Sequence, residues 1–223
     1  ILYSSTDTAA TAAKISAALP GGDISGARPT GTKMPFRILF DSHAVSAGLS
    51  TGWGFSCLIE HQKGRMLFDT GWDGGMLLHN MEMADISRES IDTIFLSHDH
   101  WDHIGGLTHV IHPKADVYVP GSFSRRLKKE ISLRSVLHEM NGPQEIMDGI
   151  YTTGVLGNAV KEQALLIETK RGVVAITGCA HPGLDVILNK ARELGKVQGA
   201  VGGFHDFKKI EKLDGLSLSL IHI

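Results

Sequence analysis

The sequence predicts an α/β fold in which mixed β-sheets are covered by helices. From Met34 onward, short apolar runs alternate with turn signals, at spacings typical of hairpins and strand–helix connections. Residues 183–194 carry a continuous apolar stripe at helical spacing, as a helix packed on a sheet would. A chain of 223 residues can bury a substantial core. We therefore expect one large domain rather than two small ones.

The expected strands are short apolar segments bounded by turn residues. They cover residues 36–40, 55–61, 65–69, 93–97, 117–119, 164–169 and 173–177. Lys63-Gly64 and Lys170-Arg171-Gly172 have the composition of tight turns, so each should join two antiparallel strands. Helices are expected at residues 75–83, 106–111, 123–131 and 183–194.

The first 33 residues differ in character from the rest. Residues 1–3, 4–8 and 9–19 have the pattern of a strand, a hydroxyl-rich loop and a helix. This order resembles the start of a flavodoxin, where such a loop holds the FMN phosphate at a helix N-terminus. Residues 21–33 are rich in Gly, Pro, Ser and Thr, as linkers are. We interpret residues 1–33 as an extension and linker, foreign to a main domain that covers residues 34–217.

The last six residues, 218–223, have an unusual sequence. Leu-Ser-Leu-Ile-His-Ile is the translation of CTGTCTCTTATACACATC, the end of a common transposase-based sequencing adapter. Our hypothesis is that residues 218–223 are a non-native tail. The competing interpretation is a strand over residues 217–223 that ends in a ligand histidine, His222. An uninterrupted reading frame through genuine codons at these positions would contradict the first interpretation.

Composition argues against several classes of protein. A net charge of −2 gives no general attraction to nucleic acid or to an anionic membrane. No apolar run is long enough to span a bilayer. The two cysteines, Cys57 and Cys179, lie far apart in apolar contexts, so we expect no disulfide framework and favour the cytoplasm. Composition predicts no oligomeric state.

A cluster of metal-binding side chains follows the apolar run that ends at Leu96. Three histidines and two aspartates occupy the six positions from His98 to His103. Crowding these groups is costly unless a cation shares them, and both types are good ligands for zinc, iron or manganese. In an extended segment, His98 and His100 would face the same side, whereas Asp102 and His103 would point differently and could serve a second ion. The sequence therefore predicts a dinuclear metal site.

Three motifs in order resemble the metallo-β-lactamase superfamily. They are Phe68-Asp69-Thr70-Gly71, His98-x-His100-x-Asp102-His103 and Gly178-Cys179-Ala180-His181. The resemblance runs from about Met34 to Phe207 and implies the αβ/βα sandwich of that superfamily, with metals at one edge between two sheets. The superfamily's final histidine would lie further along the chain, so the resemblance also implies a domain that lacks its C-terminal part.

Further segments resemble one branch of that superfamily. They are residues 54–60, 67–71, 96–107, 151–154, 162–163, 178–183 and 202–205. Members of this branch are metal-dependent hydrolases or 7,8-dihydropterin-6-methyl-4-(β-D-ribofuranosyl)aminobenzene-5′-phosphate synthases of methanopterin biosynthesis. The resemblance implies a small-molecule substrate, phosphorylated or pterin-like, and two zinc ions, with iron or manganese as alternatives.

The resemblance also implies roles for individual residues. His98, His100 and His181 would hold one metal, and Asp102 and His103 the second. A metal-activated water would be the nucleophile, and Asp102 could orient it or accept its proton.

The sequence is consistent with more than one role for Asp69 and for His205. Asp69 would orient a ligand from the outer shell, with a turn cap as the alternative. His205 follows two glycines where the superfamily has a bridging carboxylate, so it is a candidate ligand, with Asp206 as the alternative. The alternative to a metal-ligand role for His205 is that it is an ordinary surface histidine.

Other features keep more than one interpretation. Cys179 could share the face of His181, although a buried inert thiol is the favoured reading. Trp53, Trp72 and Trp101 could line an aromatic or pterin pocket or simply pack. The basic run 125–129 could meet a substrate phosphate or form a solvated helix face.

Three alternative functions compete with that of a metal-dependent enzyme. A flavodiiron-like oxidoreductase would have Glu in place of His100, and a nuclease would need a basic surface. A truncated, inactive metal-binding remnant is the non-enzymatic alternative.

Overall fold

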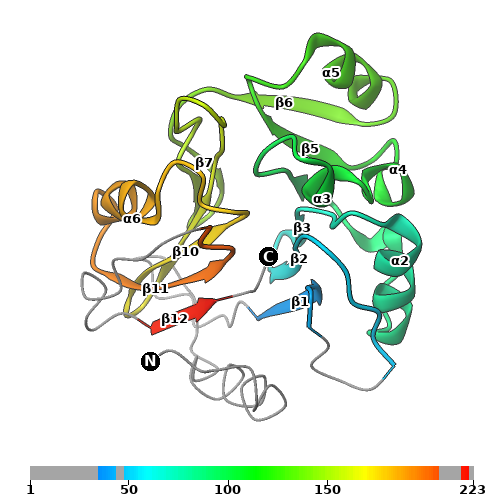
Figure 1. Cartoon of the computed structure of the whole chain (residues 1–223), viewed down its shortest axis with the longest axis horizontal. Helices are drawn as coiled ribbons and strands as arrows, with labels where there is room; N and C mark the ends of the chain where they lie inside the picture. Colours follow the sequence, from blue (N-terminus) through cyan, green and yellow to red (C-terminus); the bar gives the residue numbers. More distant parts are fainter. Residues whose placement is uncertain (1–34, 44–47, 206–216, 221–223) are drawn as a thin grey trace.

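The computed structural model describes residues 35–43, 48–205 and 217–220. Within these residues, two six-stranded mixed sheets face each other (Figure 1). The first contains β1 (Phe36–Phe40), β2 (Ser56–His61), β3 (Gly64–Phe68), β4 (Thr93–Phe95), β5 (Asp116–Pro120) and β6 (Val136–Met140), in that spatial order. The second contains β7 (Gln144–Met147), β8 (Ile150–Thr152), β9 (Leu165–Thr169), β10 (Gly172–Thr177), β11 (Val197–Gly202) and β12 (Ser217–Leu220).

Each sheet is antiparallel at its start and parallel at its end. Strands β1 to β3 pair antiparallel, and β3 to β6 pair parallel. Strands β7 to β10 pair antiparallel, and β10 to β12 pair parallel. Because parallel strands end at the same edge of a sheet, the segments that follow β3 and β4 meet there.

The helices and the core form four layers. Along β2 and β3, Leu58 and Leu67 point to helices α2 (Gly74–Met83) and α4 (Leu107–Val110), whereas Ile59 and Phe68 point to the second sheet. On the far side, α6 (Leu184–Arg192) packs its apolar stripe on the outer face of the second sheet. The result is a helix–sheet–sheet–helix sandwich, which confirms the predicted fold class (Figure 1).

Side-chain caps set the starts of two of these helices. The Asp73 carboxylate accepts the backbone N–H of Met76 at the start of α2. The Ser124 hydroxyl accepts the N–H of Leu127, so α5 (Arg125–Ser132) begins two residues later than predicted. Among the described residues, no helix is long and apolar enough to cross a membrane.

The structure contains every strand predicted between residues 36 and 177 and adds others. The strands that were not predicted are β6, β7, β8 and β11, and neither α3 (Trp101–Ile104) nor the 3₁₀ turn Arg88–Ser90 was predicted. Strands β6 and β7 are half exposed and polar, and β11 contains glycines, so none of them has a strong apolar pattern.

The two ends are described only in part. The predicted strand and helix within residues 1–33 lie outside the described residues. Residues 217–220 form β12, which agrees with the strand interpretation of that segment, while 221–223 lie outside the described residues. The proposed domain division at 33 and 217 remains a prediction.

Candidate metal centre

The candidate site lies where several strands end between the two sheets. Asp69 directly follows β3, His98 comes shortly after β4, and His181 lies in the turn after β10. The segment after β4 stays extended up to His100 and then enters α3, whose first turn carries Asp102. Strand ends from both sheets therefore bring the predicted residues together.

The close packing of α3 depends on a glycine. Gly54 has φ +98°, and a Cβ there would lie 1.7 Å from the backbone oxygen of Asp102. Since no side chain fits in that space, Gly54 allows the loop before β2 to press directly against α3.

The histidine rings face one another as the spacing predicted. The His98 ring centroid lies 4.6 Å from that of His100 and 4.9 Å from that of His181. The rings of His100 and His181 are 4.8 Å apart. Asp99, between the two histidines, is exposed, because successive side chains of an extended segment point to opposite sides. The chain then turns into α3, which carries Asp102 and His103, and the His103 ring centroid lies 4.3 Å from that of His98.

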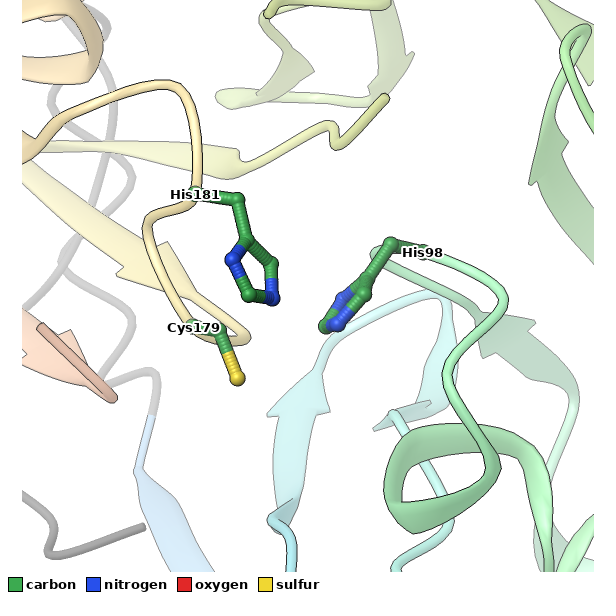
Figure 2. Close-up of side chains that lie close together, drawn as sticks. All are labelled: His98, Cys179 and His181. Atoms are coloured by element: carbon green, nitrogen blue, oxygen red, sulfur yellow. The ribbon is translucent and has the colours of Figure 1, made fainter. Parts of the chain in front are cut away.

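Two groups of potential ligand atoms result, and they share one residue. His98, Cys179 and His181 form the first group, and Asp102, His103 and Cys179 form the second. Within each group the ligand atoms all lie within 4.8 Å of one another. Figure 2 shows the side chains of the first group pointing toward one another from two separate loops.

Two buried histidine nitrogen atoms without a hydrogen-bond partner indicate that this cluster fits a metal. Among the described residues, the buried side-chain N and O atoms that lack a hydrogen-bond partner are Nε2 of His98 and Nε2 of His181. A buried polar atom without a partner costs about 1–3 kcal/mol. Both atoms belong to the first ligand group. The donor set of imidazole, thiol and carboxylate is also one that zinc accepts, so the residues fit a metal.

One buried carboxylate sets the orientation of a histidine in each group. Asp69 Oδ2 accepts from His103 Nδ1 at 2.7 Å and from the Ser97 hydroxyl at 2.6 Å. Because that hydroxyl donates to Asp69, its oxygen is free to accept from His98 Nδ1 at 2.9 Å. Both histidines are thereby oriented with Nδ1 toward this hydrogen-bond network and Nε2 toward the cluster.

Gly178 makes room for this network. A Cβ at Gly178 would lie 2.2 Å from Ser97 Oγ and 3.1 Å from Asp69 Oδ2. Only a residue without a Cβ at position 178 allows the chain after β10 to lie this close to Ser97 and Asp69.

The electrostatic environment keeps the first group neutral. Burial, and after it the neighbouring His103 and His100, lowers the pKa of His98 far below its usual range. Burial, followed by His100, lowers the pKa of His181 to about 4. Burial also works against a charge on His103, but the adjacent Asp69 carboxylate raises the pKa of His103 well above its ordinary value.

A second buried carboxylate holds the turn that carries Cys179 and His181. Glu162 Oε1 accepts from the backbone N–H groups of Cys179 and Ala180 at 3.0 Å and from the Thr177 hydroxyl at 2.9 Å. Glu162 Oε2 accepts from the N–H of His181 at 2.8 Å. Ala180 has φ +57°, so this turn is strained for a residue other than glycine and depends on such anchoring.

The next residue anchors the opposite loop. Gln163 donates its side-chain amide to Leu96 O at 2.8 Å and its backbone N–H to Ser97 O at 2.9 Å. The side-chain oxygen of Gln163 accepts from the Thr152 hydroxyl. Adjacent residues 162 and 163 therefore tie the loop of His181 to the loop of His98.

His205 lies at the edge of the cluster rather than within it. It is exposed, its ring centroid is 5.0 Å from that of His181, and its backbone N–H donates to Cys179 O. It belongs to neither group of ligand atoms. Asp206 and His222, the alternatives named from the sequence, lie outside the described residues.

The three tryptophans are exposed, and two of them contact each other. Trp53, Trp72 and Trp101 expose 61%, 39% and 58% of their surface. Trp72 and Trp101 meet edge to face with ring centroids 5.5 Å apart. Trp101 separates His100 from Asp102 in the chain, and Trp53 precedes the glycine that packs on α3.

The basic run 125–129 forms a mostly exposed face of α5. Lys128 pairs with Glu139 at 2.6 Å, on the neighbouring strand β6. This placement agrees with the solvated-face interpretation.

The sequence assigned no individual role to three residues that shape the site, Ser97, Glu162 and Gln163, although the segments of the branch resemblance include all three. That resemblance was the available signal, because a charged Glu and a Gln directly before a buried strand otherwise suggest a loop. Cys57 is buried among aromatic and aliphatic side chains of the core. Cys179 is buried too, but it lies among candidate ligands.

Comparisons with known proteins show which superfamily the chain resembles. The sequence profile described as a β-lactamase superfamily domain matches residues 64–160. The chain is 30% identical over 208 residues to the 7,8-dihydropterin-6-methyl-4-(β-D-ribofuranosyl)-aminobenzene-5′-phosphate synthase of Methanocaldococcus jannaschii. That match covers 68% of this chain and 70% of the synthase.

Solved structures show the same fold. Tm1679, a metal-dependent hydrolase of the β-lactamase superfamily, superposes with a TM-score of 0.66 at 25% identity, covering 80% of this chain and 81% of that one. A quorum-quenching N-acyl homoserine lactone lactonase superposes with a TM-score of 0.52 at 17% identity, covering 85% of this chain and 91% of that one.

Proposed function

Because the chain belongs to the metallo-β-lactamase superfamily, we propose that it is a metal-dependent enzyme that activates water at a dinuclear centre. The observation that carries this proposal is the pair of buried Nε2 atoms, on His98 and His181, that lack any hydrogen-bond partner. Zinc is the proposed metal, with iron or manganese as alternatives.

In the proposed centre, His98, His100 and His181 hold one ion, and Asp102 and His103 hold the second, with His205 as a further ligand. Two such ions would polarise the substrate and lower the pKa of water from about 15.7 toward about 7. The residues of the chain do the positioning. Asp69 keeps the Nε2 lone pair of His103 directed inward, and through Ser97 it does the same for His98.

Asp102 is proposed to orient the attacking water and to accept its proton. Its side chain is 12% exposed, and Oδ2 lies 3.5 Å from Nε2 of His103. A carboxylate that is partly open to solvent at the edge of the cluster can orient water and pass its proton outward.

The proposed substrate is a small molecule with an aromatic or heterocyclic part. The exposed tryptophans beside α3 support this proposal, because large exposed aromatic side chains provide stacking surfaces. For the reaction itself, a transferase of the dihydropterin synthase type is a second candidate beside a hydrolase. The 30% identity to the synthase of Methanocaldococcus jannaschii favours it.

The central experiment measures metal content together with activity. We expect about two metal ions per purified chain, loss of metal and of activity in His98→Ala, and retention of both in His79→Ala, an exposed histidine on α2. A full complement of metal in His98→Ala would refute the ligand assignment.

A product analysis separates the two reaction types. The protein is incubated with a dihydropterin that carries a leaving group on its 6-methyl carbon, with and without ribofuranosylaminobenzene phosphate. A joined product detected by mass spectrometry supports the transferase, whereas hydrolysis alone supports the hydrolase.

A further inference from the structure

We infer that Cys179 is a metal ligand and that its thiolate bridges the two ions. This inference rests on the dinuclear centre of the proposed function and deepens it. Within the described part of the chain, Cys179 is the one residue that belongs to both groups of potential ligand atoms. A ligand atom that lies within reach of two ions is placed to bridge them.

The contacts of Cys179 Sγ point into the cluster from both sides. On one side, Sγ lies within 4.8 Å of the ligand atoms of His98 and His181, and Figure 2 shows the three side chains converging. On the other side, Sγ is 3.1 Å from Nε2 of His103, the same nitrogen that Asp69 directs inward. The fully buried His98 also aims its unpartnered Nε2 into this space.

The backbone holds this thiol in place independently of any metal. Glu162 binds the N–H groups of residues 179, 180 and 181, so the turn cannot rotate Cys179 away from the cluster without losing these bonds. The same turn places Cys179 and His181, two positions apart, toward the same centre. Cys179 is 4% exposed, so solvent does not compete for its sulfur.

The chemistry of the donor set suits a thiolate. Zinc binds cysteine sulfur together with imidazole nitrogen and carboxylate oxygen, and a thiolate has enough lone pairs for two ions. Binding breaks the S–H bond of Cys179, forms sulfur–metal bonds and releases the proton to solvent. No oxidant or reductant is needed.

The second cysteine provides a matched control. Cys57 is fully buried in the core between the sheets, where its Sγ contacts Leu58 O at 3.7 Å. It belongs to neither ligand group. Cys57→Ser therefore removes a buried thiol without touching the cluster.

X-ray absorption at the zinc edge tests the inference on wild-type protein loaded with two zinc ions per chain. We expect an average of one sulfur neighbour per zinc, at about 2.3 Å. This signal should disappear in Cys179→Ser and in Cys179→Ala and persist in Cys57→Ser. Cobalt-loaded protein should likewise show a near-ultraviolet sulfur-to-cobalt band that only substitution of Cys179 removes.

The outcomes separate this inference from the proposed function. An average of half a sulfur per zinc would overturn the bridge, and no sulfur would overturn ligation, while the dinuclear centre would stand in both cases. Failure of the wild-type protein to bind metal at all would overturn the proposed function as well.

Discussion

The carboxylate of Glu162 should contribute several kcal/mol to stability because it satisfies three consecutive backbone N–H groups. Glu162 is fully buried, and Glu162→Gln keeps its shape while removing its charge. In the best orientation, the amide oxygen keeps the bonds to Thr177, Cys179 and Ala180. The amide nitrogen then faces the N–H of His181, so two donors meet where a 2.8 Å bond exists now.

The magnitude follows from these four bonds. An unsatisfied donor costs about 1–3 kcal/mol, and the lower end applies because His181 is only partly buried. The other three bonds change from charge-assisted to neutral, which roughly halves their strength, or about 0.5–1 kcal/mol each. We expect the free energy of unfolding to fall by about 3 kcal/mol, equivalent to a drop of about 6–12 °C in melting temperature for a chain of this size.

Chemical denaturation of chelator-treated protein measures this effect without a contribution from metal. Glu168→Gln is the matched control, since Glu168 is a partly exposed residue of β9 with a 3.4 Å bond to the Tyr151 hydroxyl. It should change stability by less than about 0.5 kcal/mol. If Glu162→Gln were as stable as that control, the anchoring role of the carboxylate would be refuted.

Three further predictions concern other parts of the chain. Ser97→Ala removes the acceptor of His98 Nδ1 and should weaken zinc binding about 10–100-fold in a chelator competition, and unchanged affinity would contradict the hydrogen-bond chain. Burial raises the pKa of Asp41 from 3.8 to about 6, so its contribution to stability is present below pH 4 and is lost as the pH rises through 6. Asp41→Asn should therefore increase the free energy of unfolding at pH 7.5 by about 1–2 kcal/mol, after allowance for partial exposure. Between pH 4 and 6, the free energy of unfolding of this variant should depend less on pH than that of the wild type, as chemical denaturation at a series of pH values would show. Trp101→Ala should raise KM for an aromatic substrate more than it lowers kcat and leave metal content unchanged, and an unaltered KM would exclude stacking on Trp101.

Local sequence predicted the elements that carry strong apolar patterns and the residues concentrated in one motif. Strands β2 and β3 alternate between two buried environments, and their hairpin turn has a typical composition. His98 and His100 face the same side because their spacing alone requires it. Strand β6, with the sequence VLHEM, has no such pattern and forms by pairing in parallel with β5.

The residues that sequence reasoning missed act through contacts between distant segments. Glu162 reaches residues 179–181 only because β9 and β10 pair, and Gln163 reaches Leu96 only because the two sheets stack. A local pattern cannot report either contact. Cys179 shows the same limit, since its partner His103 is 76 positions away.

The pair Glu162-Gln163 links the geometry of the site to the packing of the two sheets. Glu162 fixes the loop from the second sheet, and Gln163 fixes the end of the strand segment that leads to His98 in the first sheet. Because the two residues are adjacent, any sliding of one sheet on the other would separate the two loops from their shared anchor. The distance between His98 and His181 is therefore set by bonds that exist before a metal binds. A preorganised cluster of this kind loses little conformational entropy on binding an ion, which favours tight and geometrically selective metal binding.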